Sequence, residues 1–334
     1  MSELLFTGGT VVTAEGSYRA DVLVEDGRIS AVGASIGADG LETVDASGLL
    51  VMPGFIDAHT HMDMPFGGTM TADDWATGTE AAAAGGTTTI IDFALQEVGG
   101  TLAGAFEAWT EKARDRAVID YGFHVAITDL RDDIKAELPD LAAKGVASVK
   151  IFMAYKGTPL YTEDDDLFET LQLSKDAGVL VLVHAENGDA IAKLQQQALA
   201  RGDTEPRFHA LTRPEAVEAE ATNRAIRLAE VAEAPILVVH VSCAPALEAI
   251  HLAHERGQTV YAETCPSTSP SSTRTLRDQA SRAPSTCALR PCATRPTGPR
   301  SGTGSRRGTS RSSAPTTAPS TTKGRRISAW TTLP

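Results

Sequence analysis

Two histidines follow an apolar run near the start of the sequence. Residues 49–56 read Leu-Leu-Val-Met-Pro-Gly-Phe-Ile, and Asp57-Ala58-His59-Thr60-His61 comes directly after them. We interpret the run as a buried strand. Because strand side chains alternate with a period of two, His59 and His61 should point to the same side. Two imidazoles at one strand end are half of a divalent-metal site.

The other half of such a site would come from further strands. Lys150 lies within a later apolar run, and His184 and His240 each end one. In parallel α/β barrels the active-site groups sit at the carboxyl ends of the strands, where these side chains would meet. A single histidine at such a position is more often structural, and this alternative stays open for His184 or His240 taken alone. We expect structural or surface roles for the remaining histidines, which are His124, His209, His251 and His254.

Lys150 allows two interpretations. Lysine is rarely buried in full, because desolvation disfavours the charged ammonium. The side chain could snorkel to water or form a salt bridge. Alternatively, burial yields a neutral amine that reacts with CO₂ to form a carbamate, an anion whose two oxygens bridge two metal ions. Two such ions would polarise one bridging water to hydroxide.

The elements that must position these side chains fall into two parts. Residues 1–50 contain short alternating strands at 4–7, 10–12, 21–24 and 29–32, separated by Gly8-Gly9 and other turn residues, and they predict a small β-unit. From residue 51 strands alternate with helical stretches, which predicts an α/β fold with a (β/α)₈ TIM-like barrel. The predicted strands are 54–59, 87–92, 121–126, 148–153, 179–184, 235–240 and 259–263; the predicted helices are 75–84, 102–116, 164–176, 215–232 and 244–256. No apolar run follows residue 263, so the eighth strand is missing from the pattern.

The composition changes abruptly near Pro266. Residues 267–334 hold eleven Arg and one Lys against a single acid, whereas the whole chain carries a net charge of -13. This segment is rich in Ser, Thr and Pro and too poor in large apolar residues to offset its ordering entropy, so we expect it to be disordered. We therefore predict a β-unit at 1–50, an incomplete barrel at 51–266 and a separate tail at 267–334.

Several classes of function are disfavoured by the composition. No stretch resembles a signal peptide or reaches the length of a membrane span, and the four cysteines show no zinc or disulfide spacing. These features predict a cytoplasmic protein without membrane association. The arginines of the tail are scattered and accompanied by one aromatic residue, Trp330, so nucleic-acid binding has little support.

The motifs of residues 4–266 resemble the D-hydantoinase/dihydropyrimidinase family of the amidohydrolase superfamily. The His-x-His element alone occurs throughout such a superfamily. More specific matches are Met64-Pro65-Phe66-Gly67-Gly68, Phe152-Met153-Ala154-Tyr155-Lys156, Val183-His184-Ala185-Glu186-Asn187-Gly188 and Val239-His240-Val241-Ser242-Cys243. The resemblance implies hydrolytic opening of the cyclic amide of hydantoins or 5,6-dihydropyrimidines by a hydroxide that bridges two metals.

The resemblance also implies a role for each site residue. His59 and His61 would hold one divalent ion and His184 and His240 a second, with zinc as the usual metal. Lys150, carboxylated by CO₂, would bridge both. Tyr155 would hydrogen-bond the substrate carbonyl, and the pocket would be lined by Met64, Phe66, Phe152 and Tyr155. The N-terminal β-unit would form a composite β-sandwich with C-terminal strands, and the family implies a dimer or tetramer.

One family feature is missing. The family pattern requires an Asp at the end of the eighth strand as metal ligand and proton shuttle, and no such element follows Pro266. We therefore expect the tail to be an out-of-frame translation, which would leave the chain inactive. The alternatives are an allantoinase or dihydroorotase-like cyclic amidohydrolase, or a non-catalytic scaffold of the same fold. Dihydroorotate carries a carboxylate, whereas the segment 64–68 offers no cation.

Overall fold

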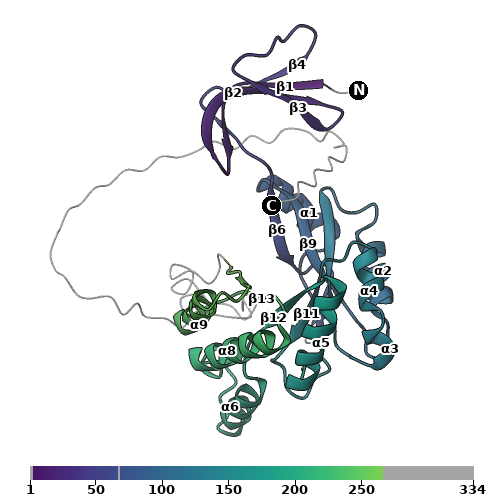
Figure 1. Cartoon of the computed structure of the whole chain (residues 1–334), viewed down its shortest axis with the longest axis vertical. Helices are drawn as coiled ribbons and strands as arrows, with labels where there is room; N and C mark the ends of the chain where they lie inside the picture. Colours follow the sequence, from purple (N-terminus) through teal and green to yellow (C-terminus); the bar gives the residue numbers. More distant parts are fainter. Residues whose placement is uncertain (1–2, 67, 266–334) are drawn as a thin grey trace, which may run out of the picture. The chain divides into compact units, whose positions relative to one another are not determined.

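The computed structural model describes residues 3–66 and 68–265 (Figure 1). These residues form two compact units: the first contains residues up to 92 together with 110–122, and the second contains 93–109 and 123–265. The segment 267–334, predicted to be an out-of-frame tail, lies outside the described residues.

The N-terminal residues of the first unit form a five-stranded sheet. Its order is β3-β2-β1-β4, and β5 also pairs with β1. The strands β1 and β2 are antiparallel, and a small apolar cluster of Val11, Ala20 and Val22 packs on them. This sheet confirms the small β-unit, while the composite sandwich stays a prediction. The strands are β1 (Glu3–Thr13), β2 (Gly16–Glu25), β3 (Arg28–Gly33), β4 (Glu42–Asp45) and β5 (Leu50–Val51).

The prediction of two separate strands at 4–7 and 10–12 is wrong. Both belong to β1, whose pairing with β2 shifts register between Phe6 and Gly9. Gly8 adopts a left-handed φ of 68° there, and its N–H donates to Asp21 at 2.8 Å. A bulge with a glycine in this conformation bends a strand without ending it, so the Gly-Gly pair is not a turn.

The remaining strands build the predicted barrel sheet. The order is β14-β13-β12-β11-β10-β9-β6; strands β10 to β14 pair in parallel, as do β6 and β9. This sheet is the seven-stranded part of a TIM-like barrel, and all seven predicted strands are present. The strands are β6 (Phe55–Thr60), β9 (Thr87–Leu95), β10 (Asp120–Ala126), β11 (Ser148–Phe152), β12 (Leu180–His184), β13 (Ile236–Val238) and β14 (Val260–Ala262), with a separate hairpin of β7 (Pro65–Phe66) and β8 (Thr69–Met70).

The helices alternate with the strands as expected. In the second unit α5 packs against α8 and α8 against α9 (Figure 1). The helices α3, α4, α6 and α7 lie outside the five helical stretches that the sequence pattern names as examples. No helix among the described residues is long and apolar enough to span a bilayer. The helices are α1 (Trp75–Ala84), α2 (Leu102–Ala113), α3 (Asp132–Lys135), α4 (Leu138–Ala143), α5 (Asp164–Ala177), α6 (Gly188–Ala200), α7 (Arg207–Leu211), α8 (Glu215–Ala232) and α9 (Ala244–Glu255).

The expectation of a buried strand before the His-x-His element is wrong. Phe55 and Ile56 are 56% and 66% exposed, and Leu49 and Leu50 are also exposed. Within the described residues β6 stands at one end of the strand order, so neighbouring strand side chains flank Phe55 and Ile56 on one side only, while Leu49 and Leu50 precede this strand. An apolar run therefore predicts a strand here correctly but not its burial.

Candidate active site

The His-x-His element lies at the end of β6. Its two imidazole rings are 5.2 Å apart and nearly perpendicular, as same-side neighbours on a strand end require. Asp92, which is fully buried on β9, accepts hydrogen bonds from the Thr60 hydroxyl at 2.9 Å and from the Met62 N–H at 2.8 Å. This carboxylate therefore fixes the backbone on both sides of His61.

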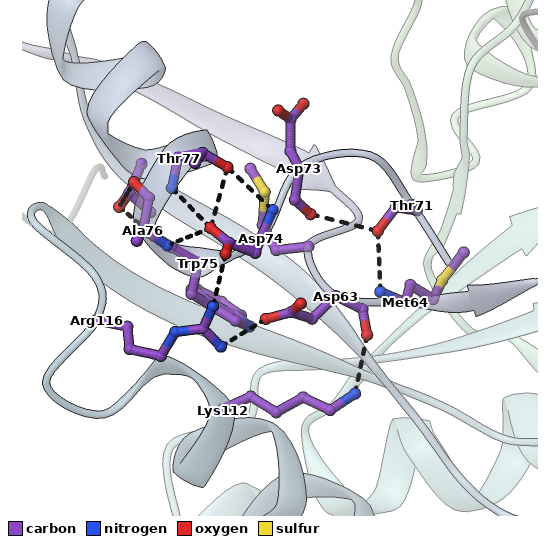
Figure 2. Close-up of polar contacts among 12 residues, drawn as sticks. Asp63, Met64, Thr71, Asp73, Asp74, Trp75, Ala76, Thr77, Lys112 and Arg116 are labelled. Atoms are coloured by element: carbon purple, nitrogen blue, oxygen red, sulfur yellow. Dashed lines mark hydrogen bonds and ion pairs between the residues drawn. The ribbon is translucent and has the colours of Figure 1, made fainter. Parts of the chain in front are cut away.

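The segment after His61 forms a hydrogen-bonded loop (Figure 2). The Asp63 N–H donates to the Asp73 carbonyl at 3.1 Å, and the Thr71 N–H donates to the Met64 carbonyl at 3.0 Å. Within the loop, Pro65 and Phe66 pair with Thr69 and Met70 as a small hairpin. Both predicted pocket residues of this loop, Met64 and Phe66, are half-buried.

Helix α1 begins at the end of this loop with an aspartate cap. The Asp74 carboxylate accepts from the N–H groups of Ala76 and Thr77, and the Thr77 hydroxyl accepts from the Asp74 backbone N–H. These hydrogen bonds, above all the one from the Thr77 N–H, hold the pKa of Asp74 below its usual range. The buried Trp75 packs edge-on against Tyr121 at 5.5 Å, which anchors the first turn of the helix.

Lys150 is buried, as predicted. It is 2% exposed in the middle of β11, and its Nζ lies 5.0 Å and 5.3 Å from the ring centres of Phe93 and Phe152. This degree of burial excludes a lysine that snorkels to water.

His184 and His240 face each other. His184 ends β12, His240 lies two residues beyond β13, and the distance from His240 Nε2 to His184 Nδ1 is 3.1 Å. Two imidazole nitrogens bound at ~2.0–2.1 Å to one tetrahedral ion are about 3.3 Å apart. The two rings therefore fit a shared divalent ion.

Buried acidic residues hold His184 and the segment after His240 in place. Glu186 is 4% exposed and its Oε2 lies 2.8 Å from His184 Nε2, so the carboxylate orients the ring and leaves Nδ1 toward His240. Glu218 of α8 accepts from the N–H and hydroxyl of Ser242, two residues after His240. The sequence motifs assign no role to Glu186, Asp92 or Glu218. The only local signal is an acidic residue near a strand end or on an apolar helix face.

Two of the predicted site residues have left-handed backbones. Tyr155 has a φ of 66° and His240 a φ of 41°, which is uncommon for residues with side chains. Such strain clusters at functional sites, because the surrounding structure must hold it in place. The Tyr155 ring lies 5.2 Å from the ring of His184, and Phe152 lies 5.8 Å from the same ring.

The candidate residues thus fall into two groups, one in each unit. His59, His61, Met64 and Phe66 belong to the first unit, whereas the second holds Lys150, Phe152, Tyr155, His184 and His240. Among residues 3–66 and 68–265, no three His, Cys, Asp or Glu side chains gather as a preformed metal site. The other buried histidine, His124, pairs with Ser148 in a structural contact.

Sequence comparisons show which known proteins this chain resembles. The profile of the amidohydrolase family matches residues 50–291. The D-hydantoinase of Geobacillus stearothermophilus is 51% identical over 263 residues, which cover 78% of this chain and 56% of that protein. The dihydropyrimidinase of Rattus norvegicus is 46% identical over 266 residues, with 78% and 51% covered.

Solved structures of a dihydropyrimidinase and a hydantoinase are also similar to this chain. The crystal structure of dihydropyrimidinase from Brevibacillus agri matches with a TM-score of 0.78 and 50% identity, covering 80% of this chain and 58% of that one. The L-hydantoinase from Arthrobacter aurescens matches with a TM-score of 0.70 and 30% identity, covering 80% and 59%. The chain spans little more than half the length of the curated relatives it matches. On the match of its barrel to the family profile, the chain belongs to the amidohydrolase family.

Proposed function

We propose that the protein hydrolyses the cyclic amide bond of hydantoins and 5,6-dihydropyrimidines. The observation that carries this proposal is the pair of facing ring nitrogens of His184 and His240, 3.1 Å apart, in the same unit as the buried Lys150. Relatives named D-hydantoinase and dihydropyrimidinase support the choice of substrate class.

The donor set is proposed to hold two divalent ions, with zinc as the metal. His59 and His61 would bind one, His184 and His240 the other, and Lys150 as its carbamate would bridge both. When bound, such ions supply Lewis-acid polarisation and lower the pKa of a coordinated water. Nitrogen ligands and a carbamate oxygen suit zinc.

The other residues are proposed to act on the substrate. The Tyr155 hydroxyl would donate to the carbonyl oxygen of the scissile amide and support the negative charge that develops there. Met64, Phe66 and Phe152 would surround the exocyclic group and exclude water. This apolar lining is less suited to dihydroorotate, whose carboxylate would need a cation. A non-catalytic scaffold would have no use for five metal-binding side chains.

The segment after Pro266 belongs to the proposal as well. We attribute its composition to an out-of-frame translation that removed the eighth-strand aspartate, and we expect reduced activity of the chain as given. Resequencing the coding DNA around codon 266 tests this attribution. It fails if the frame is confirmed and no Gly-Thr-Asp-His-like stretch lies downstream in another frame.

A cytoplasmic location and assembly into dimers or tetramers are also proposed.

Ring opening is the direct test of the function. Hydantoin and dihydrouracil are offered to the frame-corrected protein and to the chain as given, before and after chelation and zinc re-addition. We expect ring opening by the corrected protein that chelation abolishes and zinc restores, and at least about a hundredfold less by the present chain, because a proton-transfer group contributes that much. Absence of metal-dependent ring opening in the corrected protein would refute the proposal.

A further inference from the structure

The loop from Met62 to Asp74 is tied to the outside of the first unit by one arginine. Arg116 Nη1 donates to the Asp63 carboxylate at 2.9 Å, and Nη2 donates to the Asp74 carboxylate at 2.8 Å (Figure 2). The two acids stand at the two ends of the loop. One guanidinium therefore holds together the residue two positions after His61 and the cap of helix α1. We call these two ion pairs the Arg116 bridge.

A lysine from the same region supports the bridge. Lys112 Nζ, on the last turn of α2, donates to the Asp63 backbone carbonyl at 2.9 Å. Asp63 itself has a left-handed φ of 49°, a conformation that needs support in a residue other than glycine. Both cations thus converge on the residue at which the chain turns away from the histidine strand.

Global stability does not account for this arrangement. The side chains of Arg116, Asp63 and Asp74 are 41%, 24% and 39% exposed, and exposed ion pairs add little to folding. The planar guanidinium instead fixes geometry, because its separate N–H groups reach two carboxylates in set directions. The loop that it closes carries Met64 and Phe66, so its shape decides how much room an exocyclic group would have.

We infer that Arg116 is a positioning residue that holds Asp63 and Asp74 together and thereby places Met64 and Phe66, which set the size of exocyclic group the enzyme accepts. The effect of Arg116 on the size of the accepted exocyclic group rests on the proposed function. The positioning itself concerns only contacts within the first unit and is measured without substrate.

Hydrogen exchange of the full chain tests the positioning. The reporters are the N–H groups of Asp63, Met64 and Thr71, which donate to Asp73, Thr71 and Met64 respectively. In Arg116→Ala and in Asp63→Asn we expect these amides to exchange about fivefold faster, because weak surface pairs shift only local opening. Arg116→Lys, which can satisfy one carboxylate at a time, should lie between. Arg114→Ala removes a more exposed ion pair with Glu111 and should leave the exchange of these amides unchanged.

Two exchange results would overturn the inference. One is unchanged exchange at these amides in Arg116→Ala. The other is equal acceleration throughout the five-stranded sheet, which would mean general destabilisation.

Substrate range tests the consequence. The ratio of kcat/KM for 5-phenylhydantoin to that for hydantoin should change at least about fivefold in Arg116→Ala and stay constant in Arg114→Ala, because loop geometry acts on the larger group. A constant ratio in Arg116→Ala, with a loosened loop, refutes the role in substrate size. If the frame-corrected enzyme without substitutions opens neither ring, the proposed function fails, while hydrogen exchange still decides the positioning.

Discussion

At the scale of single residues, Lys150 and its neighbours concentrate the chemistry. Lys150 is nearly inaccessible between two aromatic rings, and His184 and His240 stand with nitrogens facing each other. A protein gains little by burying an ammonium group, since desolvation penalises the charge. Such residues contribute to function more than to stability. Replacing them should therefore remove function without lowering the free energy of unfolding.

Replacing Lys150 by methionine tests the contributions of this residue to stability and to metal binding separately. The metal-free Lys150→Met variant should be as stable as the parent or more stable by about 1–3 kcal/mol, because an apolar chain of similar length replaces a desolvated amine. It should also lose most bound divalent metal. Urea unfolding and elemental analysis measure the two effects, with the exposed Lys144→Met as control. A variant that keeps its metal would contradict the bridging role.

Cys243, three residues after His240, should be unreactive. Burial, with Glu218 nearby, raises the pKa of its thiol to about 12. Because the pKa is raised, the thiol stays protonated at pH 8, where alkylation should be at least about a hundredfold slower than at the half-buried Cys265. The rate should climb about tenfold per pH unit from 8 to 10. Peptide mapping after iodoacetamide measures it, and equal labelling of both cysteines would disprove the burial.

At the scale of elements, strand ends and helix starts place the site. Helix α6 begins where the Asn187 side chain accepts from the Ala190 N–H at 2.9 Å. Its first residue, Gly188, donates to the Met153 carbonyl at 3.0 Å. The start of α6 is thereby fastened to the segment that carries Tyr155, two residues beyond Met153.

Gly188→Ala should disturb this junction. An added Cβ would lie 2.9 Å from the Met153 carbonyl oxygen and 2.8 Å from the Tyr161 ring. We expect a loss of about 1–3 kcal/mol in unfolding free energy, because backbone must move to relieve the contact. Gly37→Ala, where the added methyl meets nothing within 4 Å, is the matched control in the same urea titration. Equal stability of the two variants would show that the junction tolerates a side chain.

The sequence predicts these elements well where burial marks them. Strands β11 and β12 begin or end within one residue of the predicted bounds, because continuous apolar runs identify strands covered on both faces. Helices α1 and α8 match their predicted bounds. Edge exposure at β6 is not predictable in this way, since it depends on which strand lies alongside.

Contacts that cross the fold leave no local signal. Asp92 meets Met62 across 30 residues, Glu218 meets Ser242 across 24, and Arg116 meets Asp63 across 53. The metal-ligand candidates were predictable because histidines at strand ends form a pattern within each strand. Their supporting acids and cations lie on other elements and are found only in the folded chain.

At the scale of the whole molecule, the chain consists of two units that carry different parts of the proposed centre. The first holds the His-x-His pair and the second the other histidines with Lys150. The net charge of -13 is unfavourable for nucleic-acid binding. It neither attracts nor repels uncharged cyclic amides. The central claim is therefore that both units contribute ligands to one pair of ions.

Elemental analysis of the purified, dialysed protein tests this claim most directly. The frame-corrected parent, which would regain the eighth-strand aspartate, should retain close to two divalent ions per chain. His61→Asn in the first unit and His240→Asn in the second should each lower that number, because each substitution removes a ligand from one of the two proposed ions. His251→Asn, on the exposed face of α9, should leave it unchanged. A well-folded parent without bound divalent metal, or with a content indifferent to both substitutions, would contradict the account.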